Sequence, residues 1–277
     1  MIKQKTVWML TVVMCLVGGA TAYGLWSLGR YNADTVVAQS HQVVMPGLAD
    51  SISILVVADI HLNDPPADAD RMRSLFKAVE SLPTPDAVFF SGDYNGRGSL
   101  RNPEYAAHAQ QVLQRLASLA PSYGVLGNHD QYYAKEWNAL LRKVGIVQIE
   151  HQTQSIQIGS QRVCLRGLGD AFTGHYRSIP FPDDCQGVKI TLTHDPLAIQ
   201  QDSEPGLYLA GHTHCGQLRL PFIPTFWVPT AASDNYRCGA GRDEAKQWWV
   251  SSGLGTSVVP LRLGTRAVLD WFDVSPD

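Results

Sequence analysis

Short apolar segments that each end in a cluster of Asp, His, Asn or Gly residues recur along this chain, and they limit the folds open to it. Residues 52–58, 86–92 and 123–128 indicate strands, while 68–81, 103–120 and 135–144 indicate helices between and after them. This βαβαβα half and a strand-rich remainder predict an α/β protein with two packed sheets and helices outside. The later β-like segments are 146–150, 154–158, 162–168, 188–193, 207–210, 217–220, 247–252 and 267–273.

The polar clusters follow five of these strand segments. In open α/β sheets ligands bind beyond the carboxyl ends of the strands, so we expect the five loops to converge on one site. Each cluster alone is weak evidence, because Gly-Asp is a common turn and a single loop histidine is usually a surface residue. Together they hold five of the nine histidines. The clusters are Asp59-Ile60-His61, Gly92-Asp93, Gly127-Asn128-His129-Asp130, His194-Asp195 and Gly211-His212-Thr213-His214.

Imidazole, carboxylate and amide oxygen together form the donor set of ions such as Mn, Fe and Zn, whereas Mg and Ca prefer oxygen alone. The clusters supply more such side chains than the roughly three or four protein ligands of one catalytic ion. Two divalent cations, with Mn, Fe or Zn as candidates, would use them all if they shared one carboxylate, an arrangement suited to displacement at phosphorus. The predicted metal ligands are Asp59, His61, Asp93, Asn128, His194, His212 and His214.

The five clusters follow the order of the motif blocks of the calcineurin-like metallophosphoesterases, and the chain resembles that family over roughly residues 52–262. The resemblance implies a four-layer α-β-β-α sandwich, with two mixed sheets flanked by helices, and hydrolysis of a phosphate ester by a water that bridges the two ions. It implies that His129 is catalytic and gives a hydrogen bond or proton to the leaving-group oxygen. One ion would be held by Asp59, His61, Asp93 and His214, and the other by Asp93, Asn128, His194 and His212.

The match to this family has two departures. Many family phosphatases place a second Asp three residues after the bridging one to orient the catalytic His, and here that position is Gly96. Asp130 or Asn95 could take over that task. Tyr94 is out of register with the Tyr ligand of purple acid phosphatases, which disfavours that subgroup.

The N-terminus contains 24 uncharged residues between Lys5 and Arg30, and about 20 apolar residues suffice to span a bilayer. Lys3 and Lys5 precede the segment, so the positive-inside rule places the N-terminus in the cytoplasm and the domain outside the cytoplasmic membrane. A cleaved signal peptide is the alternative, because Ala20-Thr21-Ala22 resembles a cleavage site; removal of residues 1–22 would leave a secreted or periplasmic protein.

We therefore expect a transmembrane anchor or signal peptide at 1–30, a linker or approach strand at 31–50, and a metallophosphoesterase domain at 51–277. The membrane-anchored bacterial branch of the family is loosely similar, through this segment, "SGDY" at 91–94, "GHTHCGQ" at 211–217 and "SSGLGTSVVPLR" at 251–262. Four cysteines fall in the domain, where a Cys164–Cys185 disulfide and buried free thiols are both open.

The expected partner is a phosphate-ester substrate, with a phosphodiester or pyrophosphate preferred, a lipid-linked ester as an option and a phosphomonoester as the alternative. A non-catalytic metal-binding scaffold is a further alternative. The net charge of −3 offers no basic excess for nucleic acid. The apolar stretch 220–229 could form a wall for a lipid or pack in the ordinary way. The sequence does not specify the oligomeric state.

Overall fold

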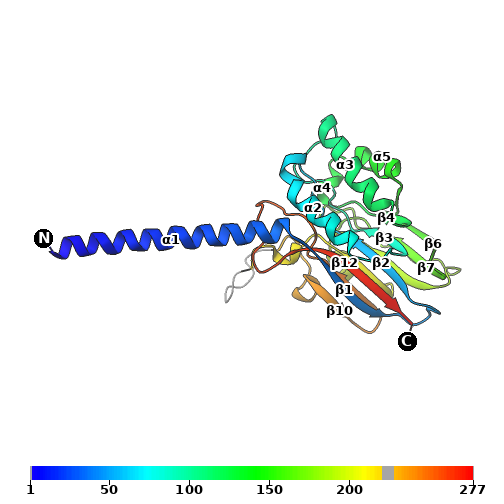
Figure 1. The fold of residues 1–277 in the computed structure, drawn as a ribbon. Helices are drawn as coiled ribbons and strands as arrows, with labels where there is room; N and C mark the ends of the chain where they lie inside the picture. The colour runs from blue at the N-terminus through cyan, green and yellow to red at the C-terminus, as the bar shows by residue number, and fades with distance from the viewer. Residues whose placement is uncertain (1, 220–227, 277) are drawn as a thin grey trace.

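The computed structural model describes residues 2–219 and 228–276, so most of the apolar stretch 220–229 lies outside the described residues. A long N-terminal helix projects from a domain in which helices and strands alternate (Figure 1). The helices are α1 Ile2–Asp34, α2 Pro65–Glu80, α3 Pro103–Ala117, α4 Asn128–Gln131, α5 Ala134–Val144 and α6 Leu197–Gln201, with 3-10 turns η1 His214–Gly216 and η2 Asp234–Tyr236. The strands are β1 Val36–Val44, β2 Ile52–Val57, β3 Ala87–Phe90, β4 Ser122–Gly124, β5 Ile146–Gln148, β6 Gln152–Ile158, β7 Gln161–Gly167, β8 Val188–Leu192, β9 Gly206–Ala210, β10 Gly239–Arg242, β11 Lys246–Val250 and β12 Ala267–Ser275.

The strands form two mixed sheets, as expected. The first sheet has the order β1-β12-β2-β3-β4-β5, and the second has the order β10-β11-β9-β8-β7-β6. In the first sheet β1 and β12 are parallel to each other, β2 is antiparallel to β12, and β2 to β5 are parallel. In the second sheet β7, β8, β9 and β11 are parallel, with β6 and β10 as antiparallel edges.

Alternating side chains along β2 show how the layers are held. Leu55 and Val57 join the apolar cluster with the helices α2, α3 and α5, whereas Ile54 and Val56 join the cluster between the two sheets. A third cluster, which includes Ile199 of α6, covers the outer face of the second sheet. The four-layer α-β-β-α sandwich is therefore confirmed, with a thin second helical layer.

Local sequence explains where the helices begin and end. Asn102 caps α3 by accepting a hydrogen bond from the Glu104 amide at 3.0 Å, and Pro103 occupies the first helical position. Gly145 ends α5 in the left-handed conformation with φ of 89°. The predicted strand at 123–128 is shorter, because Asn128 already starts α4 after Gly127.

One segment realises the approach strand that was one of two options for residues 31–50, and another segment differs from its sequence-based interpretation. Within residues 31–50, strand β1 pairs with β12 along its whole length, and one residue, Thr35, separates it from α1. Residues 217–219 form no strand in the described part of the chain, and only Leu218 makes an isolated bridge, with Leu263. The turn η1, which contains Cys215 at φ of 52°, bends the backbone before that bridge.

Helix α1 is long and apolar enough over Trp8–Asp34 to cross a membrane, with a mean hydropathy of 1.6. The outer part stands free of the domain, while its last turns contact the chain near residue 262 (Figure 1). The main-chain N–H of Arg262 donates to the Gly29 carbonyl at 2.9 Å, and Asn32 Nδ2 donates to the Arg262 carbonyl at 3.2 Å.

Two disulfides link the four cysteines of the domain. Cys164–Cys185 is the pairing that the sequence left open, and the free-thiol alternative is wrong for this pair. Cys215–Cys238, which was not predicted, ties the segment after His214 to the start of β10. Cys15 in α1 is a free cysteine.

Candidate metal centre

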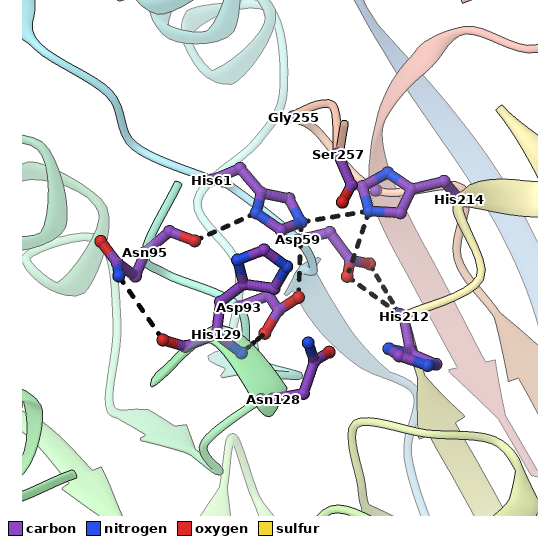
Figure 2. Close-up of polar contacts among 12 residues, drawn as sticks. Asp59, His61, Asp93, Asn95, Asn128, His129, His212, His214, Gly255 and Ser257 are labelled. Carbon is purple, nitrogen blue, oxygen red and sulfur yellow. Dashed lines mark hydrogen bonds and ion pairs between the residues drawn. The ribbon is translucent and has the colours of Figure 1, made fainter. Parts of the chain in front are cut away.

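The seven predicted ligands come together in one buried cluster. Asp59 and His61 follow β2, Asp93 follows β3, and Asn128 begins α4 in the first sheet's half of the domain. His194 follows β8, and the His212 and His214 loop follows β9 in the second sheet. Figure 2 shows side chains from both halves pointing toward the Asp59 and Asp93 carboxylates.

The first group of donors consists of Asp59, His61 and His214. His61 Nε2 lies 3.1 Å from His214 Nε2 and 3.4 Å from Asp93 Oδ2. His214 Nε2 lies 3.8 Å from Asp59 Oδ1. One ligand atom from each of these three residues fits within 4.8 Å of the others, which is close enough for a single cation.

The second group consists of Asp93, His194, His212 and Asn128. His194 Nε2 lies 3.4 Å from Asp93 Oδ2, 3.1 Å from Asn128 Oδ1 and 3.1 Å from His212 Nδ1. Asp93 Oδ2 is therefore equally distant from one histidine of each group. This carboxylate stands between the two groups (Figure 2).

The outer nitrogens of three of these histidines donate to main-chain carbonyls. His61 Nδ1 donates to Asn95 O at 3.0 Å, His194 Nδ1 donates to Ser91 O at 2.8 Å, and His212 Nε2 donates to Pro229 O. In the neutral form of the ring such a hydrogen bond places the proton on the outer nitrogen, so that the other nitrogen faces the cluster as a ligand atom, as in protein metal sites. The side chains therefore fit divalent cations in chemistry as well as in placement.

The backbone at the cluster is held in an uncommon conformation. Five of the predicted ligands have left-handed φ angles between 43° and 70° although none is glycine. Glycines also permit close approach: a Cβ atom on Gly127 would overlap the Asp93 carboxylate, and one on Gly211 would overlap Asp59. Strain of this kind clusters at functional sites. The five residues are Asp59, His61, Asp93, His212 and His214.

Burial and mutual charge perturb the acid–base groups of the cluster. Burial, aided by the Asp93 charge, raises the pKa of Asp59 to about 7. Burial would also raise the pKa of Asp93, but His194 and His61 beside it hold that pKa well below its usual range. Burial lowers the pKa of His61 to about 3 and that of His214 well below its usual value. Both histidines are thus neutral, the form that binds metals.

His129 lies beside the cluster with its ring edge toward His61, at 4.8 Å between ring centroids. Its main-chain N–H donates to Asp93 Oδ1 at 2.8 Å, so the loop position is fixed by the carboxylate that joins the two groups. Among the described residues, the ring itself makes no hydrogen bond. One nitrogen of the ring is therefore free to meet a substrate oxygen.

Asp130 and Asn95 hold the main chain around His129 and leave its ring alone. The Asp130 carboxylate accepts hydrogen bonds from the main-chain N–H groups of Tyr94, Asn95 and Gly127, at 2.9–3.3 Å. Asn95 Nδ2 donates to the His129 carbonyl at 3.5 Å. Gly96 packs so closely on the carbonyls of His61 and Leu62 that any Cβ atom there would clash. This close contact explains why an Asp is absent at that position.

A cavity of about 660 Å³ opens beside the cluster. Asp93, Asn128 and His129 line its floor, and Phe172, Leu218 and Val258 contribute apolar side chains. Val258 is 72% exposed and has a φ of 64°, which is unusual for a β-branched residue. Arg97, which also lines the cavity, donates to the Val258 carbonyl.

Sequence reasoning missed the supporting segment 251–262. Gly255 N donates to the Asp59 carbonyl at 2.6 Å, and the Arg262 side chain is completely buried behind His214, with Nη2 at 3.1 Å from His214 Nδ1. The glycines and the arginine of "SSGLGTSVVPLR" were the available signal. The motif alone does not indicate which of its residues contacts a predicted metal ligand.

Comparison with known proteins agrees with this arrangement. The sequence profile of the calcineurin-like phosphoesterases matches residues 52–216, which contain all seven predicted ligands and His129. The chain belongs to this family. It is accordingly a hydrolase of a metal-dependent family, and the predicted resemblance is confirmed.

Three relatives are 28–30% identical to this chain over the aligned segments. The uncharacterized metallophosphoesterase YkuE of Bacillus subtilis is 28% identical over 260 residues, covering 88% of each chain. Phosphodiesterase YaeI of Escherichia coli is 30% identical over 188 residues, or 66% of this chain and 67% of YaeI. A transmembrane protein with metallophosphoesterase domain from Danio rerio is 28% identical over 80% of this chain and 53% of its own length. Together with α1, the transmembrane relative suggests membrane anchoring.

Proposed function

We propose that this protein uses two divalent cations, Mn, Fe or Zn, to hydrolyse a phosphodiester or a pyrophosphate. The observation that carries the proposal is the position of Asp93, whose Oδ2 lies 3.4 Å from both His61 Nε2 and His194 Nε2. A single carboxylate oxygen thereby joins two sets of donors. A bound pair of cations would supply neutralisation of the phosphate charge and a lowered pKa for an attacking water.

The side chains divide the work. Asp59, His61 and His214 would hold one cation, Asn128, His194 and His212 the other, and Asp93 both. His129 would donate a hydrogen bond or a proton to the leaving-group oxygen, because its ring is free of other hydrogen bonds among the described residues and lies at the cavity floor. The carbonyls of Ser91, Asn95 and Pro229 orient the histidine rings.

The cavity supports an ester with an apolar substituent. Val258, Phe172 and Leu218 are 72%, 52% and 41% exposed at its rim, where an apolar group could displace water from them. A lipid-linked ester meets this requirement, and an anchored enzyme encounters such a substrate at high effective concentration. The name of the Escherichia coli relative, a phosphodiesterase, favours a diester over a monoester.

The location we propose is the cytoplasmic membrane, with α1 as a single-pass anchor and the catalytic domain on the extracytoplasmic side. Two disulfides in the domain support an oxidising compartment. The lysines before the apolar segment support the same orientation. Protease should degrade the domain once the layers outside the cytoplasmic membrane are permeabilised, while that membrane is still intact. Digestion only after lysis of the cytoplasmic membrane would show the opposite orientation.

The test of the reaction uses the purified full chain in detergent with Mn²⁺. We expect hydrolysis of bis-p-nitrophenyl phosphate that exceeds hydrolysis of p-nitrophenyl phosphate, and loss of activity in Asp93→Asn. Asp183→Asn is the matched control, because Asp183 is an exposed residue between β7 and β8 and is not one of the predicted ligands. A preference for the monoester would make the protein a phosphomonoesterase. Full metal occupancy without hydrolysis of any phosphate ester would identify a metal-binding scaffold and refute the proposal.

A further inference from the structure

Arg262 joins the end of the membrane helix to the metal centre. Its main chain is bonded to α1, through the Gly29 carbonyl at 2.9 Å and Asn32 Nδ2 at 3.2 Å. Its side chain points the other way, toward His214 Nδ1 at 3.1 Å. One residue therefore contacts both the last turns of α1 and a predicted ligand.

The Arg262 guanidinium also organises the loop 252–255, which contacts the main chain at Asp59. It donates to the carbonyls of Ser252, Gly253 and Gly255 at 2.6–3.1 Å. Gly255 N in turn donates to the Asp59 carbonyl at 2.6 Å, and Leu254 N to the Ala58 carbonyl at 3.0 Å. Arg262 is thus linked to the main chain of Asp59 through one intervening residue, Gly255, and it directly contacts the His214 ring.

These contacts all lie on one side of the metal centre. The donors near Arg262 are those of the first group, Asp59, His61 and His214, while no hydrogen bond in the described residues links Arg262 to the group of His194, His212 and Asn128. Among the described residues Arg262 has no carboxylate in ion-pair contact. A fully buried arginine held by carbonyls keeps its place because its five N–H donors match those carbonyls.

We propose that Arg262 is a positioning residue that couples the seating of α1 on the domain to the geometry of the first donor group. The inference rests on the proposed function, since it takes Asp59, His61 and His214 as ligands of one cation. If the last turn of α1 shifts, the Arg262 main chain shifts with it, and the guanidinium moves the loop 252–255, whose Gly255 N–H donates to the Asp59 carbonyl. Affinity for one of the two cations should then fall while the other is retained.

The test measures Mn²⁺ binding by the full chain in detergent, with both dissociation constants resolved by electron paramagnetic resonance titration. Asn32→Leu removes one hydrogen bond to Arg262 at the helix and leaves the cluster itself unchanged. Tyr31→Ala is the matched control, because Tyr31 is 59% exposed on the same turn. Arg262→Gln removes the guanidinium that joins the two sets of contacts. Changes to residues that hold metal ligands in place typically weaken metal binding roughly 10- to 100-fold.

We expect Arg262→Gln to weaken one Mn²⁺ site by about that range and Asn32→Leu to weaken the same site to a smaller extent, with Tyr31→Ala unchanged. If Arg262→Gln does not fold, Asn32→Leu alone decides. Two wild-type affinities in Asn32→Leu, or an equal loss at both sites, would overturn the coupling although the proposed function stands. Absence of Mn²⁺ from the wild-type cluster would instead refute the proposed function, and the coupling with it.

Discussion

Replacing His129 with alanine isolates the proposed proton donor from the metal centre. The ring makes no hydrogen bond within the described chain and lies edge-to-face with the His61 ring, while the main-chain N–H that binds Asp93 remains in the variant. We therefore expect a stability loss below about 1 kcal/mol and full Mn²⁺ binding. Loss of a positioned proton donor costs roughly 10²- to 10⁴-fold in rate, equivalent to about 3–5 kcal/mol in activation free energy.

The assay compares two diesters in His129→Ala and wild type. Hydrolysis of bis-p-nitrophenyl phosphate should suffer less, because p-nitrophenolate leaves without a proton, than hydrolysis of a diester with an alkyl alcohol as leaving group. Mn²⁺ content is measured in the same preparations. Equal losses with both esters would refute the role in proton donation. Loss of Mn²⁺ would identify His129 as a ligand, an alternative that its place within 4.8 Å of His61 and Asp93 donor atoms makes testable.

Three other perturbations have defined outcomes. Asp93→Asn should lower the affinity for both cations, because Asp93 Oδ2 faces a histidine of each group, and a variant that keeps one Mn²⁺ at wild-type affinity would contradict the shared role. Removing the Cys215–Cys238 disulfide by serine substitution should cost about 3 kcal/mol of stability and weaken Mn²⁺ binding, because Cys215 follows His214. Removing Cys164–Cys185, whose sequence separation is similar (21 against 23), should cost similar stability and leave Mn²⁺ binding intact. Equal losses of Mn²⁺ binding in the two variants would contradict this prediction. The hydrogen bond from His108 and the charge of Arg71 lower the pKa of Asp68 to about 2, although burial acts in the opposite direction. Because the folded pKa lies below the unfolded value, the stabilisation of about 2–3 kcal/mol is present above roughly pH 4 and is lost toward pH 2. The Asp68→Asn variant should therefore show a flatter dependence of thermal unfolding on acid pH.

The positions of the predicted ligands could be foreseen because the local sequence shows where each strand ends and which polar residues follow it. Asp59, Asp93 and His194 each follow an apolar run, and parallel strands bring such loops to one edge. The spacing of His212 and His214 also mattered, since their rings reach different donor groups. The left-handed backbone at both residues could not be foreseen, because non-glycine residues adopt it only when the surrounding fold enforces it.

Features that depend on distant parts of the chain were missed. An approach strand was one option for residues 31–50, but the pairing of β1 with β12, more than 200 residues away, was not predicted. Cys215–Cys238 and the contacts of Arg262 arise in the same way, from segments that meet only after both sheets have formed. The surroundings of His129 were partly anticipated: Asn95 donates to the His129 carbonyl, and Asp130 binds the N–H groups of neighbouring residues, but neither contacts the ring.

The single residue between α1 and β1 limits how the domain can move. Because Thr35 alone separates α1 from β1 and the Arg262 contacts lie beside it, the domain cannot rotate freely about the end of α1. If α1 spans the bilayer as proposed, the helix would fix the height and tilt of the domain, and only phosphate groups presented at one depth would come within reach. Selection by depth would then precede selection by chemistry, and a flexible insertion after Asp34 would abolish it.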